Sequence, residues 1–110
     1  MRKQKKEITK IIERFELIEE KLGVAISGLY ATCEHEPDEH EFAIQINFDV
    51  NSLSGGKLER VAYIASAYNS SGQLLGKATV STYDLHGFSS ESISLRIDQE
   101  PVRIRLFPSA

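Results

Sequence analysis

The sequence predicts a mainly β protein: a small two-layer antiparallel β-sandwich of about six strands, preceded by one N-terminal amphipathic helix. Three observations support this prediction. Runs of alternating apolar and polar residues fill most of the chain after Gly23, and clusters of Gly, Asn, Ser, Asp and Pro separate those runs. A helical period occurs only before Gly23. We therefore expect an amphipathic helix within residues 1–22 and a β-sandwich domain over residues 23–110.

The helix is predicted over residues 5–22, where large apolar residues recur at spacings of three and four and Gly23 supplies a C-terminal stop. Most of them also fit the a and d positions of a short heptad pattern. The stripe is expected either to dock on the sandwich or to mediate self-association or contact with a protein partner. The apolar residues of the stripe are Ile8, Ile11, Ile12, Phe15, Ile18 and Leu22. The expected contact residues are Ile8, Ile11, Phe15 and Ile18.

Strict alternation over residues 42–50 predicts the clearest core strand, with Ile44, Ile46 and Phe48 facing inward. In the preceding strand, the apolar parity shifts by one residue at Ser27-Gly28, which indicates a β-bulge. The predicted core as a whole contains Ile44, Ile46, Phe48, Ile93, Leu95, Ile97, Ile104 and Leu106.

Later turns are predicted from their glycines and polar residues. Residues 58–69 and 73–83 should form a hairpin whose turn places Gly72 in the left-handed conformation. Residues 51–57 and 84–90 are predicted loops. Two more alternating strands should follow the second of these loops.

Composition and charge restrict the class of protein. The chain has 110 residues, 41% hydrophobic and 26% charged, which suits one soluble globular domain. No apolar run approaches the roughly 18 residues of a membrane span. The single cysteine excludes an internal disulfide framework and favours a reducing, cytoplasmic setting.

The net charge of −3 hides an asymmetry between the two parts of the chain. Residues 1–22 carry seven Lys/Arg and five Asp/Glu, whereas the remainder carries six and eleven. An acidic β domain makes nucleic acid an unexpected partner, because phosphate binding needs a basic face.

The densest group of potential metal ligands lies over residues 33–41. If Glu36-Pro37-Asp38-Glu39 forms a four-residue turn, His35 and His40 become cross-strand partners about 5 Å apart at Cβ, and Cys33 shares their face. Two imidazoles and a thiolate in this arrangement could bind zinc or a similar ion. The alternative is a charged, solvated hairpin tip, and no other cofactor is expected.

Catalytic signals are weak in this sequence. Asp84, His86, Ser89 and Ser90 share a predicted loop, but no Gly-x-Ser-x-Gly elbow presents a serine to a base. Among the aromatic residues, Phe88 and Phe107 are the best candidates for an exposed contact surface.

One strand–turn–strand pattern comprises Ala65 to Asn69, Ser70-Ser71-Gly72, Gln73-Leu74-Leu75-Gly76 and Thr82-Tyr83-Asp84-Leu85. This pattern resembles small bacterial immunoglobulin-like sandwich domains of the FxLYD type. The resemblance covers about half of the chain, and Val80-Ser81-Thr82-Tyr83-Asp84 replaces the Phe-x-Leu-Tyr-Asp string. It implies an immunoglobulin-like sandwich that serves as an appended interaction module.

Three classes of function follow from these observations. The first is a non-catalytic protein-interaction or structural module, which the sequence favours because it holds no motif that demands a particular chemistry. The second is a metal-binding domain that uses Cys33, His35 and His40. The third is an enzyme whose site is assembled from residues distant in the sequence.

Overall fold

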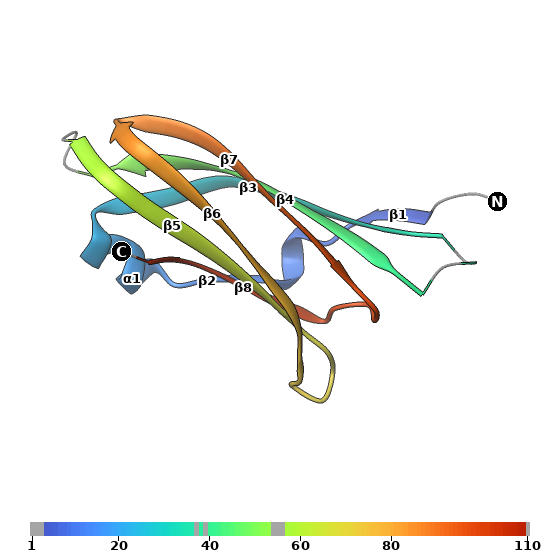
Figure 1. Ribbon diagram of the computed structural model, residues 1–110. Helices are drawn as coiled ribbons and strands as arrows, with labels where there is room; N and C mark the ends of the chain where they lie inside the picture. Colours follow the sequence, from blue (N-terminus) through green and yellow to red (C-terminus); the bar gives the residue numbers. More distant parts are fainter. Residues whose placement is uncertain (1–3, 37, 39, 54–56, 110) are drawn as a thin grey trace.

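Two four-stranded sheets face each other in a computed structural model that describes residues 4–36, 38, 40–53 and 57–109 (Figure 1). Sheet A has the strand order β1-β3-β4-β7, and sheet B has the order β2-β8-β5-β6. The mainly β, two-layer prediction is confirmed, but the described residues form eight strands instead of about six, and β2 pairs parallel with β8. The elements are β1 (Gln4–Glu7), the 3₁₀ turn η1 (Thr9–Ile11), β2 (Ile12–Arg14), α1 (Glu16–Leu22), β3 (Val24–His35), β4 (Phe42–Ser52), β5 (Lys57–Tyr68), β6 (Leu74–His86), β7 (Phe88–Ile97) and β8 (Arg103–Ser109).

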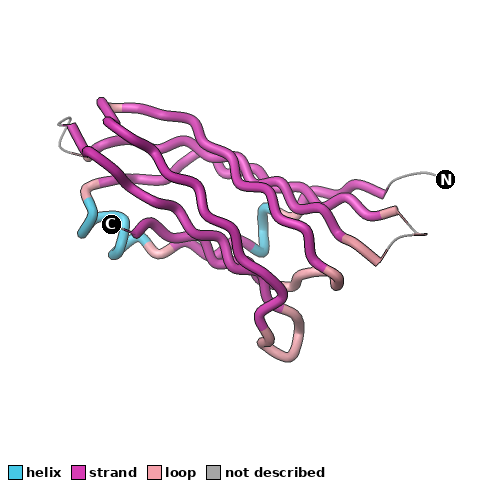
Figure 2. Tube along the Cα trace, in the orientation of Figure 1, coloured by secondary structure: helices cyan, strands magenta, loops and turns pink. Residues whose placement is uncertain are grey.

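The prediction of one helix over residues 5–22 is wrong. Only residues 16–22 form the α-helix, and Figure 2 shows that strand precedes it. β1 pairs antiparallel with β3, and β2 pairs parallel with β8, so the N-terminal segment crosses from one sheet to the other. The edges of β3 and β8 carry backbone N–H and C=O groups that pair with this segment, and this tertiary pairing overrides the helical pattern.

The predicted apolar stripe is divided among these elements. Ile8 is buried, and Ile11 and Ile12 pack partly against the core. Phe15, at the start of the helix, contacts the ring of Phe107 on β8, whereas Ile18 is 36% exposed. The stripe is therefore not one continuous face for docking or for a coiled coil.

A buried carboxylate fastens α1 to the sandwich. Glu19 is 2% exposed, and its carboxylate accepts two hydrogen bonds from Arg14, Nη2 to Oε1 at 2.8 Å and Nε to Oε2 at 3.2 Å. The backbone N–H of Ile26 donates to Oε1 at 2.9 Å. The hydrogen bond to Glu19 is the main cause that raises the pKa of Arg14. Glu19 therefore links α1 to β2 and β3.

The core predicted from alternation is confirmed, because all eight predicted core residues are buried. Phe48 from sheet A meets Tyr63 from sheet B edge-on, with ring centroids 5.4 Å apart. The bulge is confirmed between Ser27 and Tyr30, where Gly28 has φ +60°. Gly72 takes the predicted left-handed conformation in the β5–β6 hairpin, with φ +80°.

The predicted loop over residues 84–90 is wrong. β6 continues to His86, and β7 begins at Phe88, so that Gly87 alone joins a strand of sheet B to a strand of sheet A. The predicted loop over residues 51–57 is shorter than expected, because β4 extends to Ser52 and β5 starts at Lys57. Residues 54–56 of that prediction lie outside the described residues.

The immunoglobulin-like connectivity is not confirmed. In immunoglobulin domains the second and third strands, B and C, lie in opposite sheets. Here the two strands that follow the N-terminal segment, β3 and β4, pair with each other within sheet A. The sandwich architecture is therefore established without that strand order.

The two sheets diverge toward one end of the molecule. Figure 1 shows that β1 and the β3–β4 hairpin extend beyond sheet B, while the β5–β6 hairpin turns away from them. The molecule is elongated, with principal extents of 48 × 27 × 19 Å. Part of the inner face of sheet A is therefore not covered by the opposite layer.

Candidate functional site

The uncovered part of the inner face of sheet A, here called the open end, comprises Gln4, His35 and Phe42 and the side chains around them. The buried Ile97 of β7 completes this cross-strand row at the edge of the core. The rings of His35 and Phe42 stack with centroids 4.1 Å apart and planes 9° apart. Both side chains are half-buried. An aromatic stack thus occupies the position at which the inner face of the sheet meets solvent.

A hollow of about 270 Å³ lies beside this stack, toward β1. Lys6 Nζ lies 2.9 Å from Glu100 Oε1 across it. Cys33 is buried in its wall, and desolvation is the main cause that raises the pKa of the thiol, with the Glu100 charge adding to the effect. The lining residues are Gln4, Lys5, Lys6, Cys33, His35, Phe42 and Glu100.

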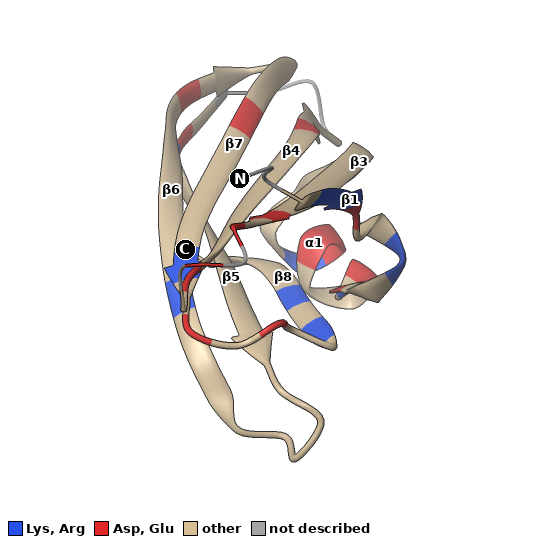
Figure 3. Cartoon of the chain, turned by 90° about the vertical axis from the view of Figure 1, so that its right-hand side faces the viewer, with Lys and Arg blue, Asp and Glu red and all other residues tan. Residues whose placement is uncertain are grey.

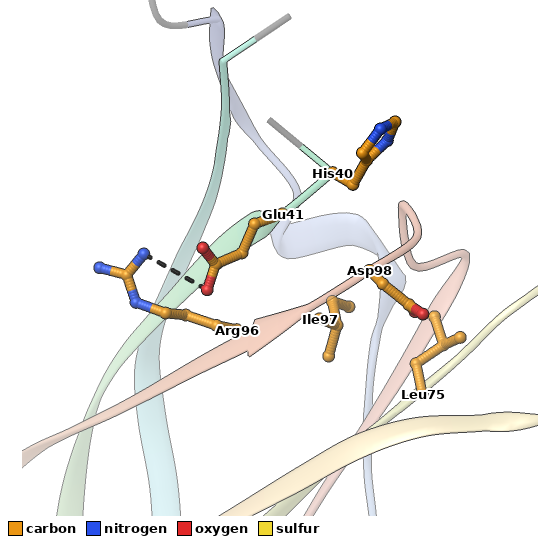
Figure 4. Close-up of a pocket in the computed structure, with 6 residues that line it drawn as sticks. All are labelled: His40, Glu41, Leu75, Arg96, Ile97 and Asp98. Atoms are coloured by element: carbon orange, nitrogen blue, oxygen red, sulfur yellow. Dashed lines mark ion pairs between the residues drawn. The ribbon is translucent and has the colours of Figure 1, made fainter. Parts of the chain in front are cut away.

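A larger and more open hollow of about 640 Å³ lies on the other side, between β7 and β6 (Figure 4). Its lining residues are His40, Glu41, Leu75, Arg96, Ile97 and Asp98. Arg96 Nη1 lies 3.7 Å from Glu41 Oε1. Figure 4 shows Leu75 near Ile97 and Asp98, and the His40 ring pointing away from them.

The position of this larger hollow follows from Gly76. A Cβ at Gly76 would lie 2.9 Å from Ile97 Cγ2, so the backbone of β6 approaches β7 closely at this residue. That close approach seals the core. Leu75, the residue before Gly76, is the residue of β6 that lines the hollow.

The register expected for the metal site is wrong. His35 pairs with Phe42 and Cys33 with Ile44, a shift of two residues from the expected pairing of His35 with His40. The connection is longer than a four-residue turn, since β3 ends at His35 and β4 begins at Phe42. His40 therefore lines one hollow, and Cys33 and His35 line the other.

Metal-ligating side chains do not converge in any other region of the described part of the chain either. Residues 4–36, 38, 40–53 and 57–109 contain no group of three His, Cys, Asp or Glu side chains placed to hold an ion. Pro37 and Glu39, which belong to the predicted turn, lie outside those residues.

The two predicted aromatic contact residues lie in different sheets. Phe88 is 59% exposed at the start of β7, on the outer face of sheet A. Phe107 is half-buried on β8 and meets Phe15 edge-on with ring centroids 5.7 Å apart. They do not form one surface.

The residues of the predicted 84–90 loop are also separated, because Asp84 and His86 lie on β6 and the two serines on β7. Ser89 Oγ donates to Glu91 Oε2 at 2.7 Å, and Ser90 Oγ donates to Asp49 Oδ1 at 2.8 Å. These hydroxyl groups donate to carboxylates instead of to a histidine base, so the loop offers no argument for a nucleophile.

Glu91 is a feature that the sequence pattern missed. It points inward from β7, an edge strand, and accepts a hydrogen bond of 2.6 Å from Thr82 Oγ1 of β6. An inward-facing charge on an edge strand discourages pairing with another chain. We therefore assign the β6–β7 seam a structural role and not a binding role.

Most of the open end gives no signal in the sequence. The helical period predicts a helix at Lys6, and the alternation and turn signals predict ordinary strand and turn positions for Leu75, Arg96 and Asp98. Asp98 and Glu100 lie between the last two predicted strands, but their proximity to β6 and β1 depends on pairing between distant segments. The alternation over residues 42–50 is the one local signal for the open end, because it predicts that Phe42 is the first inward-facing residue of its strand.

Comparison with known proteins gives no relative: no family model, no curated protein and no solved structure matches the chain. Within the described residues, no helix is both long enough and apolar enough to cross a lipid bilayer.

Proposed function

We propose that this protein is a non-catalytic interaction module that binds a protein partner at the open end of its sandwich. One observation carries the proposal: sheet A extends past sheet B and leaves the His35–Phe42 stack without an opposing layer, between two hollows. A central aromatic or aliphatic group surrounded by a polar rim is the usual anatomy of a protein-binding surface.

The charges around the open end support a protein partner over a nucleic acid. Its cations lie beside carboxylates, as in the pairs Lys6–Glu100 at 2.9 Å and Arg96–Glu41 at 3.7 Å. Such a surface carries no excess of positive charge with which to release counterions from phosphates. Solvent-exposed ion pairs contribute little to folding, so they can exchange partners at an interface at low cost.

The cytoplasm is the compartment that suits this proposal. Cys33 is free and buried, and its raised pKa keeps the sulfur as a thiol. A domain that depends on packing without disulfides suits a reducing compartment.

Capture from a lysate of the source cells tests the proposal. Immobilised wild type is compared with Phe42→Asp and with the matched variant Phe88→Asp, which alters an exposed Phe at the opposite end of the sandwich. Loss of a hot-spot side chain costs about 2 kcal/mol or more, which corresponds to a roughly 30-fold weaker affinity. We expect wild type and Phe88→Asp to retain the same protein and Phe42→Asp to lose it.

Leu75→Asp provides a second variant, because Leu75 lines the larger hollow without belonging to the buried core. It guards against a Phe42 variant that fails to fold. If Phe42→Asp and Leu75→Asp both retain the partner and Phe88→Asp loses it, the binding surface lies elsewhere.

A further inference from the structure

The outer face of sheet B presents a different arrangement of side chains from the open end. Alternation along β5 directs Arg60, Ile64, Ser66 and Tyr68 outward, opposite to the buried Tyr63. The register brings residues of β6 and β8 beside them. The cross-strand neighbours are Tyr83 for Arg60, Thr79 and Phe107 for Ile64, Lys77 and Arg105 for Ser66, and Arg103 for Tyr68. We call this surface the basic face.

The cations of this face are largely unpaired. Arg60, Lys77 and Arg103 are exposed, and none has an acidic partner among the described residues. Arg60 donates only to the hydroxyl of Ser81, at 3.4 Å. A chain with a net charge of −3 thus gathers free positive charge on one face.

The fourth cation, Arg105, is held in place. Its Nε lies 3.1 Å from Glu13 Oε1, and its guanidinium lies 5.2 Å from the centroid of the Tyr68 ring. Glu13 is the one acidic residue of β2, and it lies beside this face. Figure 3 shows basic residues on β8, with α1 and its acidic residues beside that strand.

The middle of the face is apolar. Ile64 and Phe107 are half-buried neighbours across β5 and β8, and the Phe15 ring extends this row edge-on. Tyr83, on β6, is 67% exposed beside Arg60. Arginine and aromatic residues are enriched at protein interfaces relative to the rest of a protein surface. Here they surround an apolar centre.

We propose that the basic face is a second docking surface, which binds an acidic segment of a partner protein. An apolar side chain of that segment rests on the row of Ile64 and Phe107, and its carboxylates lie against Lys77, Arg103 and Arg60. The surface belongs to sheet B, so it is separate from the open end, and the two proposals can fail independently.

Charge and spacing favour a polypeptide over a nucleic acid. Arg60 and Tyr68 are eight residues apart on β5, or about 26 Å at the usual rise of a strand. Four cations over such a length are fewer than the roughly six to ten phosphate contacts of a typical nucleic-acid complex.

Fluorescence anisotropy with a defined probe tests this proposal. The probe is a fluorescein-labelled peptide of alternating glutamate and leucine, and the comparison ligands are a lysine–leucine peptide of equal length and a labelled oligouridylate. Wild type is measured beside Lys77→Glu/Arg103→Glu. Lys21→Glu, which removes an exposed cation from α1 outside both proposed surfaces, is the matched control.

We expect wild type and Lys21→Glu to bind the acidic peptide with equal affinity and Lys77→Glu/Arg103→Glu to bind it at least 10-fold more weakly, with affinity falling as salt rises. Both altered side chains are exposed, so the variant should keep its fold. Equal binding by all three proteins, equal affinity for the lysine peptide, or tighter binding of the oligouridylate would each overturn the proposal.

Discussion

Tyr63 lies between the two sheets with its ring against Phe48, and its hydroxyl group has no hydrogen-bond partner among the described residues. Alternation along β5 explains the burial of the ring, because Tyr63 shares the inner face with Val61, Ala65 and Ala67. Burying an unpaired hydroxyl group is unfavourable. Desolvation is the main cause that raises the pKa of Tyr63; the nearby Thr82 side chain, which donates its own proton to Glu91, lowers it, and the Glu91 charge raises it.

Replacing Tyr63 with Phe should raise the free energy of unfolding by about 1 kcal/mol, since it removes the unpaired group and keeps the ring. The pH dependence should change as well. The unfolded chain ionises its Tyr63 near pH 10, before the folded chain does, so wild type loses stability as the pH rises above 10. Tyr63→Phe should lack this part of the loss.

Denaturant unfolding at neutral pH and above pH 10 measures both effects. Tyr68→Phe is the control, because Tyr68 is only half-buried and should change stability by less than about 0.5 kcal/mol. A destabilisation of Tyr63→Phe at neutral pH would contradict this account and indicate that the hydroxyl group has a partner.

Residue burial was the most predictable property of this chain. Period-two alternation places every second side chain inward, and it gave the correct burial of Ile46, Phe48 and Leu106 without knowledge of strand pairing. Glu19 could not be predicted in this way. A carboxylate is buried only where donors meet it, and those donors come from β2 and β3.

At the scale of elements, the N-terminal segment serves to cover strand edges. After β1, the N–H of Ile8 donates to the carbonyl of Ala31 at 2.8 Å, and the N–H of Ala31 donates to Thr9 Oγ1 at 3.0 Å. These hydrogen bonds extend the coverage of the β3 edge beyond β1. The spacing of three and four between apolar residues is equally compatible with a helix, and sequence alone did not reveal the competing edges.

Glu19→Gln should loosen the attachment of α1. Removing one partner of a buried ion pair costs about 3–5 kcal/mol. We expect the lower end, about 3 kcal/mol, because the amide keeps one acceptor and Arg14 reaches solvent. Thermal or denaturant unfolding measures the loss, and Glu20→Gln, on an exposed neighbouring position, should stay within about 0.5 kcal/mol. A loss below about 1 kcal/mol would show that the carboxylate does not fasten the helix.

The register of the β3–β4 hairpin shows a second limit of sequence analysis. The expected and observed pairings differ by two residues, and a shift of two keeps each side chain on the same face. Alternation therefore fixed the faces of Cys33, His35 and Phe42 but left their cross-strand partners open. That difference replaced an expected His35–His40 pair with the His35–Phe42 stack.

At the scale of the whole molecule, the open end results from unequal extension of the two layers. Residues from β1, β3, β4, β6, β7 and the segment before β8 line its two hollows. No stretch of sequence contains this set, so only the tertiary structure could reveal the candidate site. The alternating pattern predicted the sandwich, and the pairing of distant segments determined where the sandwich opens.

The charge distribution is also a property of the whole molecule. Counting charges along the chain assigned the excess of cations to residues 1–22. In the folded protein, Lys5 and Lys6 lie beside Glu34 and Glu100. The unpaired Arg60, Lys77 and Arg103 lie together on the outer face of sheet B. Net charge along the sequence therefore did not predict which surface is basic.

Site-specific photocrosslinking in the source cells tests the central claim most directly. Benzoylphenylalanine replaces Phe42 at the open end and, in matched variants, Tyr30 or Phe88, which are exposed on the outer face of sheet A. The account predicts a light-dependent adduct with another protein from position 42 and much weaker adducts from positions 30 and 88. Adducts from position 30 or 88 with none from position 42 would contradict it.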